Sequence, residues 1–418
     1  MGTAIGLGLL NPPPPSDKTV RVRMIDTKSF MSLHAFSFVK PVMPGHERMS
    51  VTTVAFLIEN ERLGKKAMFD LGTRKDYWNS PPFTLTRIEA AIPGVKIEKD
   101  VTEILQEQGT RLDEIGMELE SHLEPISIRN LTLADDIIWS HSHWDHMGSP
   151  HLFPPSTRLS YGKGTGPFPA YPENPNSNLN ADDFKDRECV EIDCTDLNIG
   201  PFPATDFYGD GSLYLLDTPG HWLGHICALA RTTPDTFVFL GGDICHFAGD
   251  FRPSEEIPLP NSIPADSLLS SQKYPMPCPC EFFSAHHPQL REIGPSVDTK
   301  STPFYQLSTH AHSTYKDPAT AVISTYGMQK YFDADPNVMV FLAHDTSLLD
   351  HLPTFNENPD DDLNDWKRLG YKQKCHWGWM GELPRYDKDG NVAGPGNREK
   401  PIVDGLWVDG ALVEGFKK

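Results

Sequence analysis

The chain has 418 residues, of which 38% are hydrophobic and 10% aromatic, enough apolar material for a sizeable core. Its 57 Asp and Glu against 37 Lys and Arg give a formal net charge of −20, and such an acidic surface does not attract nucleic acid or an anionic membrane. No apolar stretch approaches the ~20 residues of a membrane helix, and the 7 scattered cysteines lack the pattern of a disulfide framework. We therefore expect a cytoplasmic protein without nucleic-acid or membrane partners, whose oligomeric state the sequence leaves open.

Residues 1–19 are predicted to form a flexible N-terminal arm, because their apolar start runs into Pro12–Pro15 without the basic region or cleavage site of a signal peptide. Residues 20–418 are expected to form one domain. Short segments rich in Val, Phe and Met, separated by polar turns, predict its first strands: 20–25, 52–58 and 67–71. One or two short helices are expected within 101–120.

Further along the chain, four apolar runs each end in a cluster of His or Asp: 137–139, 213–216, 237–240 and 338–342. Loop insertions are predicted around 162–184, which is rich in Gly, Pro and Asn, and around 251–302, which is rich in Pro and Ser. A helix is expected to begin at Asp317 as N-cap and Pro318 as its first residue. The extended tail 351–418 is acidic and rich in turns.

The run after the strand at 137–139 contains four side chains that can bind a metal within six residues: His141, His143, Asp145 and His146. A helix would scatter such residues around its axis, whereas a loop that leaves the end of a strand can direct all of them into one cavity. A solvated polar turn would be sufficient explanation for a single His pair. For the whole cluster the pattern favours a metal site.

With this cluster and the motifs that follow it, the sequence resembles the metallo-β-lactamase superfamily, because the later apolar runs are followed by that family's motifs in the same order. These are the T-P-G-H motif at Thr218–His221, the bridging-carboxylate motif at Gly241–Asp243 and the last His motif at Ala343–Asp345, with the early D-x-G turn at Asp70–Gly72. The resemblance implies an α/β fold, a four-layer αββα sandwich of two mixed β-sheets with flanking helices and long loop insertions. It also implies that Asp70 packs beneath the site.

The resemblance further implies two sets of metal ligands that share one carboxylate. The first metal would take His141, His143 and His221, the second would take Asp145, His146 and His344, and Asp243 would bridge both. Imidazole and carboxylate ligands suit two zinc ions, and also iron, manganese or cobalt. Two metals held close together would share a hydroxide, lower its pKa and polarise a carbonyl group.

Within the superfamily the chain most resembles the lactonase branch that includes the N-acyl-homoserine lactonases. This resemblance implies a binuclear metal-dependent hydrolase that opens a lactone or a related cyclic ester or amide of a small-molecule substrate, by attack of the bridging hydroxide. Asp145 would pass a proton to the leaving group. That branch commonly has a Tyr three residues after the bridging Asp; here the position is His246. We expect His246 either to contact the substrate carbonyl in place of the Tyr or to turn away and pack beside Phe247.

Two alternatives remain open. A thioester hydrolase of the glyoxalase II type shares all seven ligands, but it normally holds glutathione with basic residues in its tail, and the tail here has the acidic run 360–362. A metal-binding protein without catalysis is disfavoured because every candidate ligand is retained. Of the other histidines, His225 is expected to be structural. His286 and His287 are expected either to line the pocket or to lie on a surface loop, and His310 and His312 are expected on a loop near the site rather than among the ligands.

Overall fold

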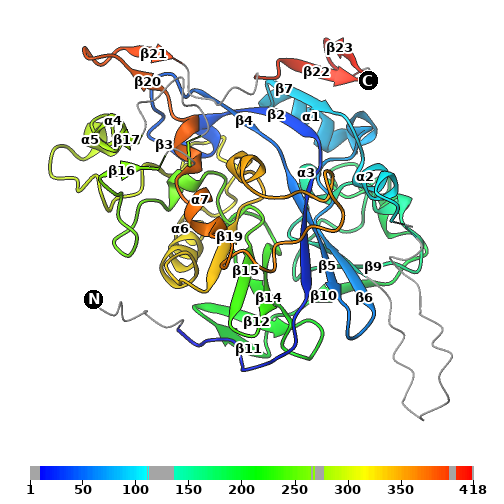
Figure 1. Cartoon of the computed structure of the whole chain (residues 1–418). Helices are drawn as coiled ribbons and strands as arrows, with labels where there is room; N and C mark the ends of the chain where they lie inside the picture. Colours follow the sequence, from blue (N-terminus) through cyan, green and yellow to red (C-terminus); the bar gives the residue numbers. More distant parts are fainter. Residues whose placement is uncertain are drawn as a thin grey trace.

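The computed structural model describes residues 10–110, 112, 136–264, 267–268, 277–394 and 402–416. At its centre two six-stranded sheets pack face to face (Figure 1). The strands of the first sheet are, in spatial order, β1 (Arg21–Asp26), β5 (Val54–Asn60), β6 (Lys65–Phe69), β8 (Asp136–Trp139), β9 (Arg158–Gly162) and β10 (Cys189–Ile192). Those of the second are β11 (Leu197–Ile199), β12 (Phe202–Asp206), β13 (Leu213–Asp217), β14 (Ile226–Thr233), β15 (Thr236–Leu240) and β19 (Val338–Phe341).

Both sheets are mixed. In the first, β1, β5 and β6 are antiparallel, and β6, β8, β9 and β10 run parallel to one another. In the second, β11 to β15 are antiparallel and β19 joins β15 in parallel. The strands predicted at 20–25, 52–58 and 67–71, and the four apolar runs that precede His or Asp, are therefore confirmed within two residues at each end.

Alternate residues of the strands form the core between the two sheets. Val22 of β1 and Phe56 of β5 share a buried cluster with Leu215 of β13, Ala228 of β14 and Phe341 of β19. Because successive side chains of a strand point to opposite faces, the remaining residues form two outer apolar faces that need cover.

Helices cover both outer faces. On the first sheet, α2 (Val101–Glu107) packs Ile104 and Leu105 against Met68. On the second, α6 (Pro318–Met328) packs Met328 against Phe239. The predicted four-layer αββα sandwich is confirmed. Most of the predicted helical segment beyond Glu107 lies outside the described residues.

Two further helix predictions can be checked in the same region. The side chain of Asp317 accepts a hydrogen bond from the backbone N–H of Thr320, as an N-cap does, and Pro318 is the first residue of α6. Among the described residues no helix is long and apolar enough to cross a membrane.

A third, five-stranded sheet was not predicted. Its strands are, in order, β23 (Ala411–Val413), β22 (Gly405–Val408), β7 (Gly94–Ile97), β2 (Ser29–His34) and β4 (Arg48–Val51). β22 pairs in parallel with β7, so part of the tail returns to the N-terminal half of the chain (Figure 1). The strands are too short, and too much of their pairing is long-range, for a local pattern to reveal them.

The tail also carries α7 (Tyr371–Cys375), where Lys372 is buried. Its ammonium group donates hydrogen bonds of 2.6, 2.7 and 2.7 Å to the backbone carbonyls of Asp333, Asp335 and Val338. The carboxylate of Asp333 in turn pairs with Arg252 at 2.7 Å. This buried network joins the predicted insertion 251–302 and the tail to the segment that leads into β19. The division into an N-terminal arm, one domain, two insertions and a tail stays a prediction.

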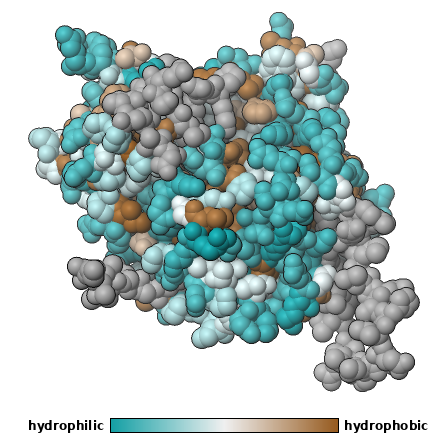
Figure 2. All heavy atoms as spheres, in the orientation of Figure 1, coloured by the Kyte–Doolittle hydropathy of each residue, from teal (hydrophilic) through white to brown (hydrophobic). Residues whose placement is uncertain are grey.

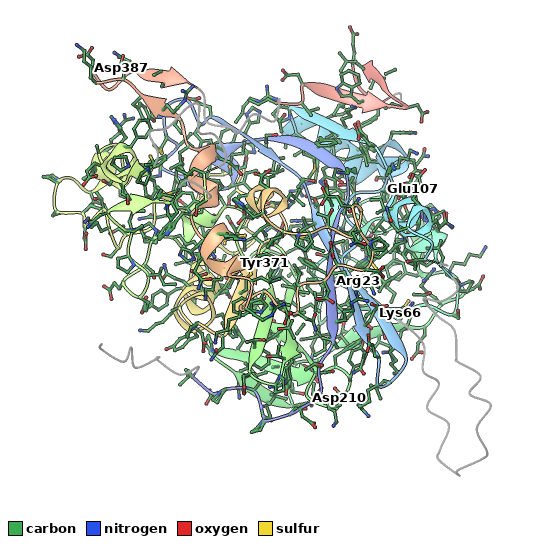
Figure 3. All side chains as sticks on the ribbon, in the orientation of Figure 1. Arg23, Lys66, Glu107, Asp210, Tyr371 and Asp387 are labelled. Atoms are coloured by element: carbon green, nitrogen blue, oxygen red, sulfur yellow. The ribbon has the colours of Figure 1, made fainter. Side chains whose placement is uncertain are left out.

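The visible surface is mainly hydrophilic, with small scattered apolar patches (Figure 2). Ion pairs cross the first sheet, where Arg23 and Lys66 lie on strands on either side of β5 (Figure 3). Both pair with Glu59 of β5, with N–O distances of 2.7 and 3.7 Å. Asp387 lies at the turn between β20 (Arg385–Tyr386) and β21 (Val392–Gly394), where it accepts hydrogen bonds from backbone N–H groups.

Candidate metal centre

The seven residues predicted as metal ligands lie together at one end of the sandwich, on loops that leave strands of both sheets. The first sheet supplies His141, His143, Asp145 and His146, which follow β8 and continue into the short helix α3 (Trp144–Met147). The second sheet supplies His221 after β13, Asp243 after β15 and His344 after β19. The strand-end placement inferred from the apolar runs therefore holds for every one of them.

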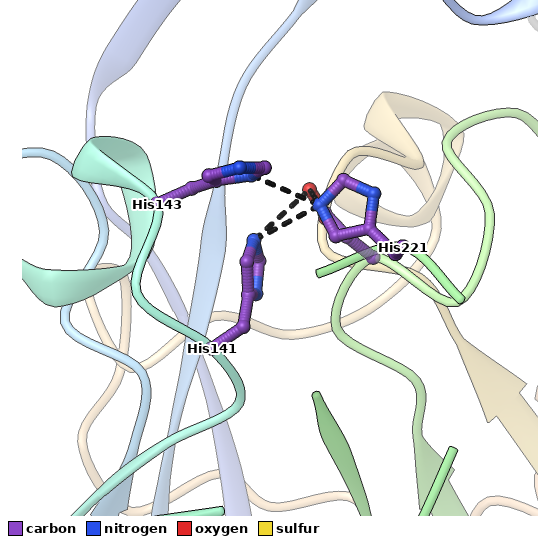
Figure 4. Close-up of side chains that lie close together, drawn as sticks. His141, His143 and His221 are labelled. Carbon is purple, nitrogen blue, oxygen red and sulfur yellow. Dashed lines mark hydrogen bonds and ion pairs between the residues drawn. The ribbon is translucent and has the colours of Figure 1, made fainter. Parts of the chain in front are cut away.

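The first donor group consists of His141, His143 and His221 with one oxygen of Asp243 (Figure 4). The Nε2 atom of His221 lies 3.1 Å from Nε2 of His141 and 2.9 Å from Nδ1 of His143. Burial, together with the neighbouring imidazoles, holds the pKa of His141 well below its ordinary value, and burial does the same for His143 and His221. Neutral imidazoles are the form that binds a metal.

The second group consists of Asp145, His146 and His344. Nδ1 of His146 donates to Asp70 at 2.8 Å, and Nδ1 of His344 donates to the carbonyl of Thr52 at 2.8 Å. In the neutral form of each ring, which is the form that binds a metal, Nε2 therefore carries the lone pair, and each Nε2 lies 3.2 Å from Oδ1 of Asp243. A hydrogen bond that fixes one ring nitrogen and leaves the other for a metal is the usual arrangement at metal sites.

Asp243 lies between the two groups. Its Oδ2 is 3.4 Å from Nε2 of His221 and 3.7 Å from Nε2 of His141, on the side of the first group, while Oδ1 faces the second. Oδ1 of Asp243 and Nε2 of His146 are buried without a hydrogen-bond partner. Burial opposes protonation of His146, but Asp243 and Asp70 raise its pKa well above the ordinary value. These donors fit a divalent cation, because a bound cation would lie between buried imidazole nitrogens and carboxylate oxygens that otherwise face one another.

Asp70 supports both groups from below, as the resemblance implied. It stands directly after β6 with φ of 58° and accepts hydrogen bonds from Ser140 N at 2.7 Å, Ser140 Oγ at 2.8 Å and His146 Nδ1 at 2.8 Å. Ser140 Oγ also lies 3.0 Å from Nδ1 of His141, so one carboxylate orients an imidazole in each group.

His225 was expected to be structural, and both of its ring nitrogens contact backbone groups. Nδ1 lies 3.0 Å from the carbonyl of Thr218, and Nε2 accepts a hydrogen bond from the backbone N–H of Asp243 at 3.1 Å. The adjacent Gly242 has φ of +49°, and a Cβ there would come within 2.9 Å of Ser140 Cβ. The turn that delivers Asp243 therefore requires a glycine.

His246 lies within the site, where its nitrogen could also serve as a metal donor with Asp243 and His344, and each of its ring nitrogens has a polar neighbour. Nε2 is 3.0 Å from Oδ2 of Asp243, and Nδ1 is 2.9 Å from the hydroxyl of Tyr315. Its ring packs against Phe38, with the ring centroids 4.6 Å apart. Tyr315, which stands in a loop before α6, has no motif around it that would mark it in the sequence. Its buried aromatic hydroxyl beside His221 could be found only from the fold.

The other four histidines considered from the sequence, His286, His287, His310 and His312, lie on loops. His312 lines the cavity over the site, and His310 precedes it on the same loop. His287 bonds the carbonyl of Thr302 at 3.0 Å, and His286 stacks on Tyr386, with the ring centroids 4.4 Å apart.

Residues of both donor groups, His143, Asp145, Asp243 and His344, line a cavity of about 150 Å³. Apolar side chains from several elements make up much of its wall: Leu33, Phe38, Phe83, Ile88, Ile92, Trp144 and Trp222. Asn178, from the predicted insertion 162–184, also lines the cavity and donates a hydrogen bond to the carbonyl of Ser142, between two of the ligands. The arrangement can bind a small, mainly apolar molecule directly over the metal donors.

No protein-family model matches the chain. It is 34% identical over 390 residues to Gamma-lactamase FDB1 of Fusarium pseudograminearum, covering 90% of this chain and 85% of that protein. It is 33% identical over 372 residues to Metallo-hydrolase mfmC of Annulohypoxylon moriforme, covering 87% of each. A solved structure of an N-acyl homoserine lactone hydrolase matches 81% of this chain and 98% of its own, with 16% identity and a TM-score of 0.48. The extended similarity to the two curated hydrolases, together with the sandwich fold and the His/Asp cluster, shows that this chain is a metal-dependent hydrolase of the metallo-β-lactamase superfamily.

Proposed function

We propose that the chain opens the ring of a γ-lactam or a lactone with two divalent ions, zinc by default, held in the two donor groups. The observation that carries the proposal is the position of Asp243, whose two oxygens face different donor groups that border one small cavity. Ions bound there would activate water as the nucleophile and polarise the scissile carbonyl.

The chain's own residues would orient the substrate and move its protons. Asp145 lines the cavity, with Oδ2 at 3.5 Å from Nε2 of His344, and we propose that it passes a proton to the leaving group. His246 also lines the cavity. Because its Nε2 is directed at Asp243, we propose that its part in the reaction passes through that carboxylate rather than through the substrate carbonyl. This role differs from that of the Tyr in the lactonases.

Size and charge support a small ring over a glutathione thioester. The cavity of about 150 Å³ is below the ~300–1,000 Å³ of pockets for drug-sized ligands. Arg87 is the sole Lys or Arg among the described residues that line it, whereas glutathione carries two carboxylates. The name of the relative Gamma-lactamase FDB1 supports a cyclic amide.

The seven free cysteines are consistent with a cytoplasmic setting, which we include in the proposal.

The substrate proposal is tested by steady-state hydrolysis of matched compounds by the zinc-loaded protein. We expect a γ-lactam or a γ-lactone to exceed S-acyl glutathione in kcat/KM by about a hundredfold. A small ring fits inside the cavity with its carbonyl at the metal donors, whereas part of S-acyl glutathione would have to stay outside. Aryl esters serve as the open-chain comparison. Strong thioester turnover without ring opening would instead support the glyoxalase II-like alternative.

The binuclear proposal predicts about two ions per chain in protein purified without chelator. His344→Ala should retain about one, because the first donor group is intact, and should lose most activity. Elemental analysis of the purified variants measures this. His286→Ala is the control, since that ring stacks on Tyr386 away from the donors, and it should keep the wild-type metal content. One ion per chain in fully active wild-type protein would contradict the binuclear arrangement.

A further inference from the structure

We propose that Tyr315 is a positioning residue for the shared carboxylate: its hydroxyl orients His246, and His246 in turn holds Asp243 between the two donor groups. This inference rests on the proposed two-ion function and extends it to a side chain on a loop remote in sequence from the metal motifs. The three groups form a continuous chain, with 2.9 Å from the Tyr315 hydroxyl to His246 Nδ1 and 3.0 Å from His246 Nε2 to Asp243 Oδ2.

The direction of the hydrogen bonds follows from what each group can donate. A carboxylate only accepts, so a hydrogen bond between Nε2 of His246 and Asp243 requires the ring proton on Nε2. In the neutral imidazole Nδ1 then has a bare lone pair, and it can only accept. The phenol of Tyr315 is the group placed to donate to it. Tyr315 therefore selects the tautomer in which His246 donates to Asp243, in the way that second partners fix metal-site histidines.

Packing holds this chain in one geometry. His246 and Tyr315 are each 3% exposed. The loop of Tyr315 is hydrogen-bonded to the T-P-G-H motif: Lys316 N donates to His221 O at 2.8 Å, and Asp317 N donates to Gly220 O at 2.9 Å. The same loop thus contacts the backbone beside one ligand and, through the Tyr315 side chain, the residue that holds another.

The consequence concerns which lone pairs of Asp243 remain for ions. The hydrogen bond from His246 occupies one side of Oδ2, and Oδ1 has no hydrogen-bond partner in the described part of the chain. With Oδ2 held in this way, the carboxylate cannot rotate both oxygens toward one donor group. A carboxylate free to rotate would bind one ion with both oxygens and weaken the other site.

The experiment is a double-mutant cycle between Tyr315→Phe and His246→Gln, with cobalt(II) as the probe ion. Tyr315→Phe removes only the hydroxyl. His246→Gln keeps an N–H that can reach Asp243 and removes the nitrogen that Tyr315 bonds. We expect Tyr315→Phe to weaken cobalt affinity about tenfold, to alter the cobalt d–d absorption spectrum and to lower kcat with KM unchanged. In the His246→Gln background the same substitution should have no further effect.

Tyr305→Phe is the matched control, because Tyr305 is also fully buried and its hydroxyl lies 2.7 Å from Nδ1 of a different histidine, His46. It should leave the cobalt affinity and spectrum unchanged. The proposal is overturned if Tyr315→Phe binds cobalt like the wild type, or if its effect is equally large in the His246→Gln background. Because the cobalt affinity and the spectrum are measured without substrate, they test the role of Tyr315 even if the protein hydrolyses no lactam or lactone. A lack of lactam and lactone hydrolysis would refute only the proposed function.

Discussion

Replacement of Asp243 by asparagine is expected to lower kcat/KM roughly a thousandfold, which corresponds to on the order of 4 kcal/mol of transition-state stabilisation. The carboxylate faces both donor groups, with Oδ1 at 3.2 Å from His344 Nε2 and Oδ2 at 3.4 Å from His221 Nε2. An amide carries no charge and has one acceptor oxygen, so it cannot serve two cations. The metal content should fall below one ion per chain by elemental analysis, while the circular dichroism spectrum stays that of a folded protein.

Asp250→Asn is the matched control for this experiment. Asp250 is buried on the same loop, seven residues further on, but it belongs to neither donor group. Burial raises its pKa well above the ordinary value, which favours the neutral carboxyl group, and asparagine is a neutral side chain of nearly the same shape. Metal content and rate should therefore stay near wild type. Equal losses in the two variants would show that the loop tolerates no substitution, and the role assigned to Asp243 would lose its support.

Asp333→Ala is expected to destabilise the fold by about 3–5 kcal/mol, because it leaves the buried guanidinium of Arg252 without a counter-charge. Urea unfolding at pH 7 measures the change. The matched control is Asp365→Ala, which removes an exposed ion pair with Arg368 and should cost under about 1 kcal/mol. A cost for Asp333→Ala as small as that of the control would mean that the buried network does not stabilise the tail.

The same pair gives a pH dependence. Although burial alone would raise it, Arg252 lowers the pKa of Asp333 below its ordinary value. A carboxyl group with a depressed folded-state pKa contributes stability that is present above its unfolded pKa of about 3.9 and is lost as the pH falls toward the folded value. The difference in unfolding free energy between the wild type and Asp333→Ala should therefore narrow below about pH 4.

The metal centre could be predicted from the sequence because each donor residue stands shortly after an apolar run, and each run is a strand. Each of the runs 137–139, 213–216, 237–240 and 338–342 is a buried strand, and the fold brings the polar residue after each run to the same end of the sandwich. The length of each apolar run predicts a strand, and the His or Asp that follows the run is then predicted to lie at the strand end. Neither prediction requires knowing which strands pair with one another.

The parts that could not be predicted depend on contacts between distant segments. Tyr315 reaches His246 across 69 positions of sequence, and no local pattern marks either as a partner of the other. The sheet that contains β22 and β7 unites the tail with the N-terminal half, and these two strands are 4 residues long each. Strands this short are decided by the edge on which they pair and not by their own composition.

The division of the donors between the sheets has a consequence for the whole molecule. Each donor group contains residues from both sheets, so an ion bound there would link the two sheets. Part of the free energy of ion binding would then stabilise the association of the sheets. Thermodynamic coupling is reciprocal. Sheet association therefore favours ion binding by the same factor by which bound ions favour sheet association. A cavity opened between the sheets, at Ile138 or Leu215 for example, would lower the stability of the sandwich that holds the donors together and so favour loss of the ions. Retention of bound metal would therefore report on core packing far from the cavity, and selection for metal binding would also constrain the hydrophobic interior.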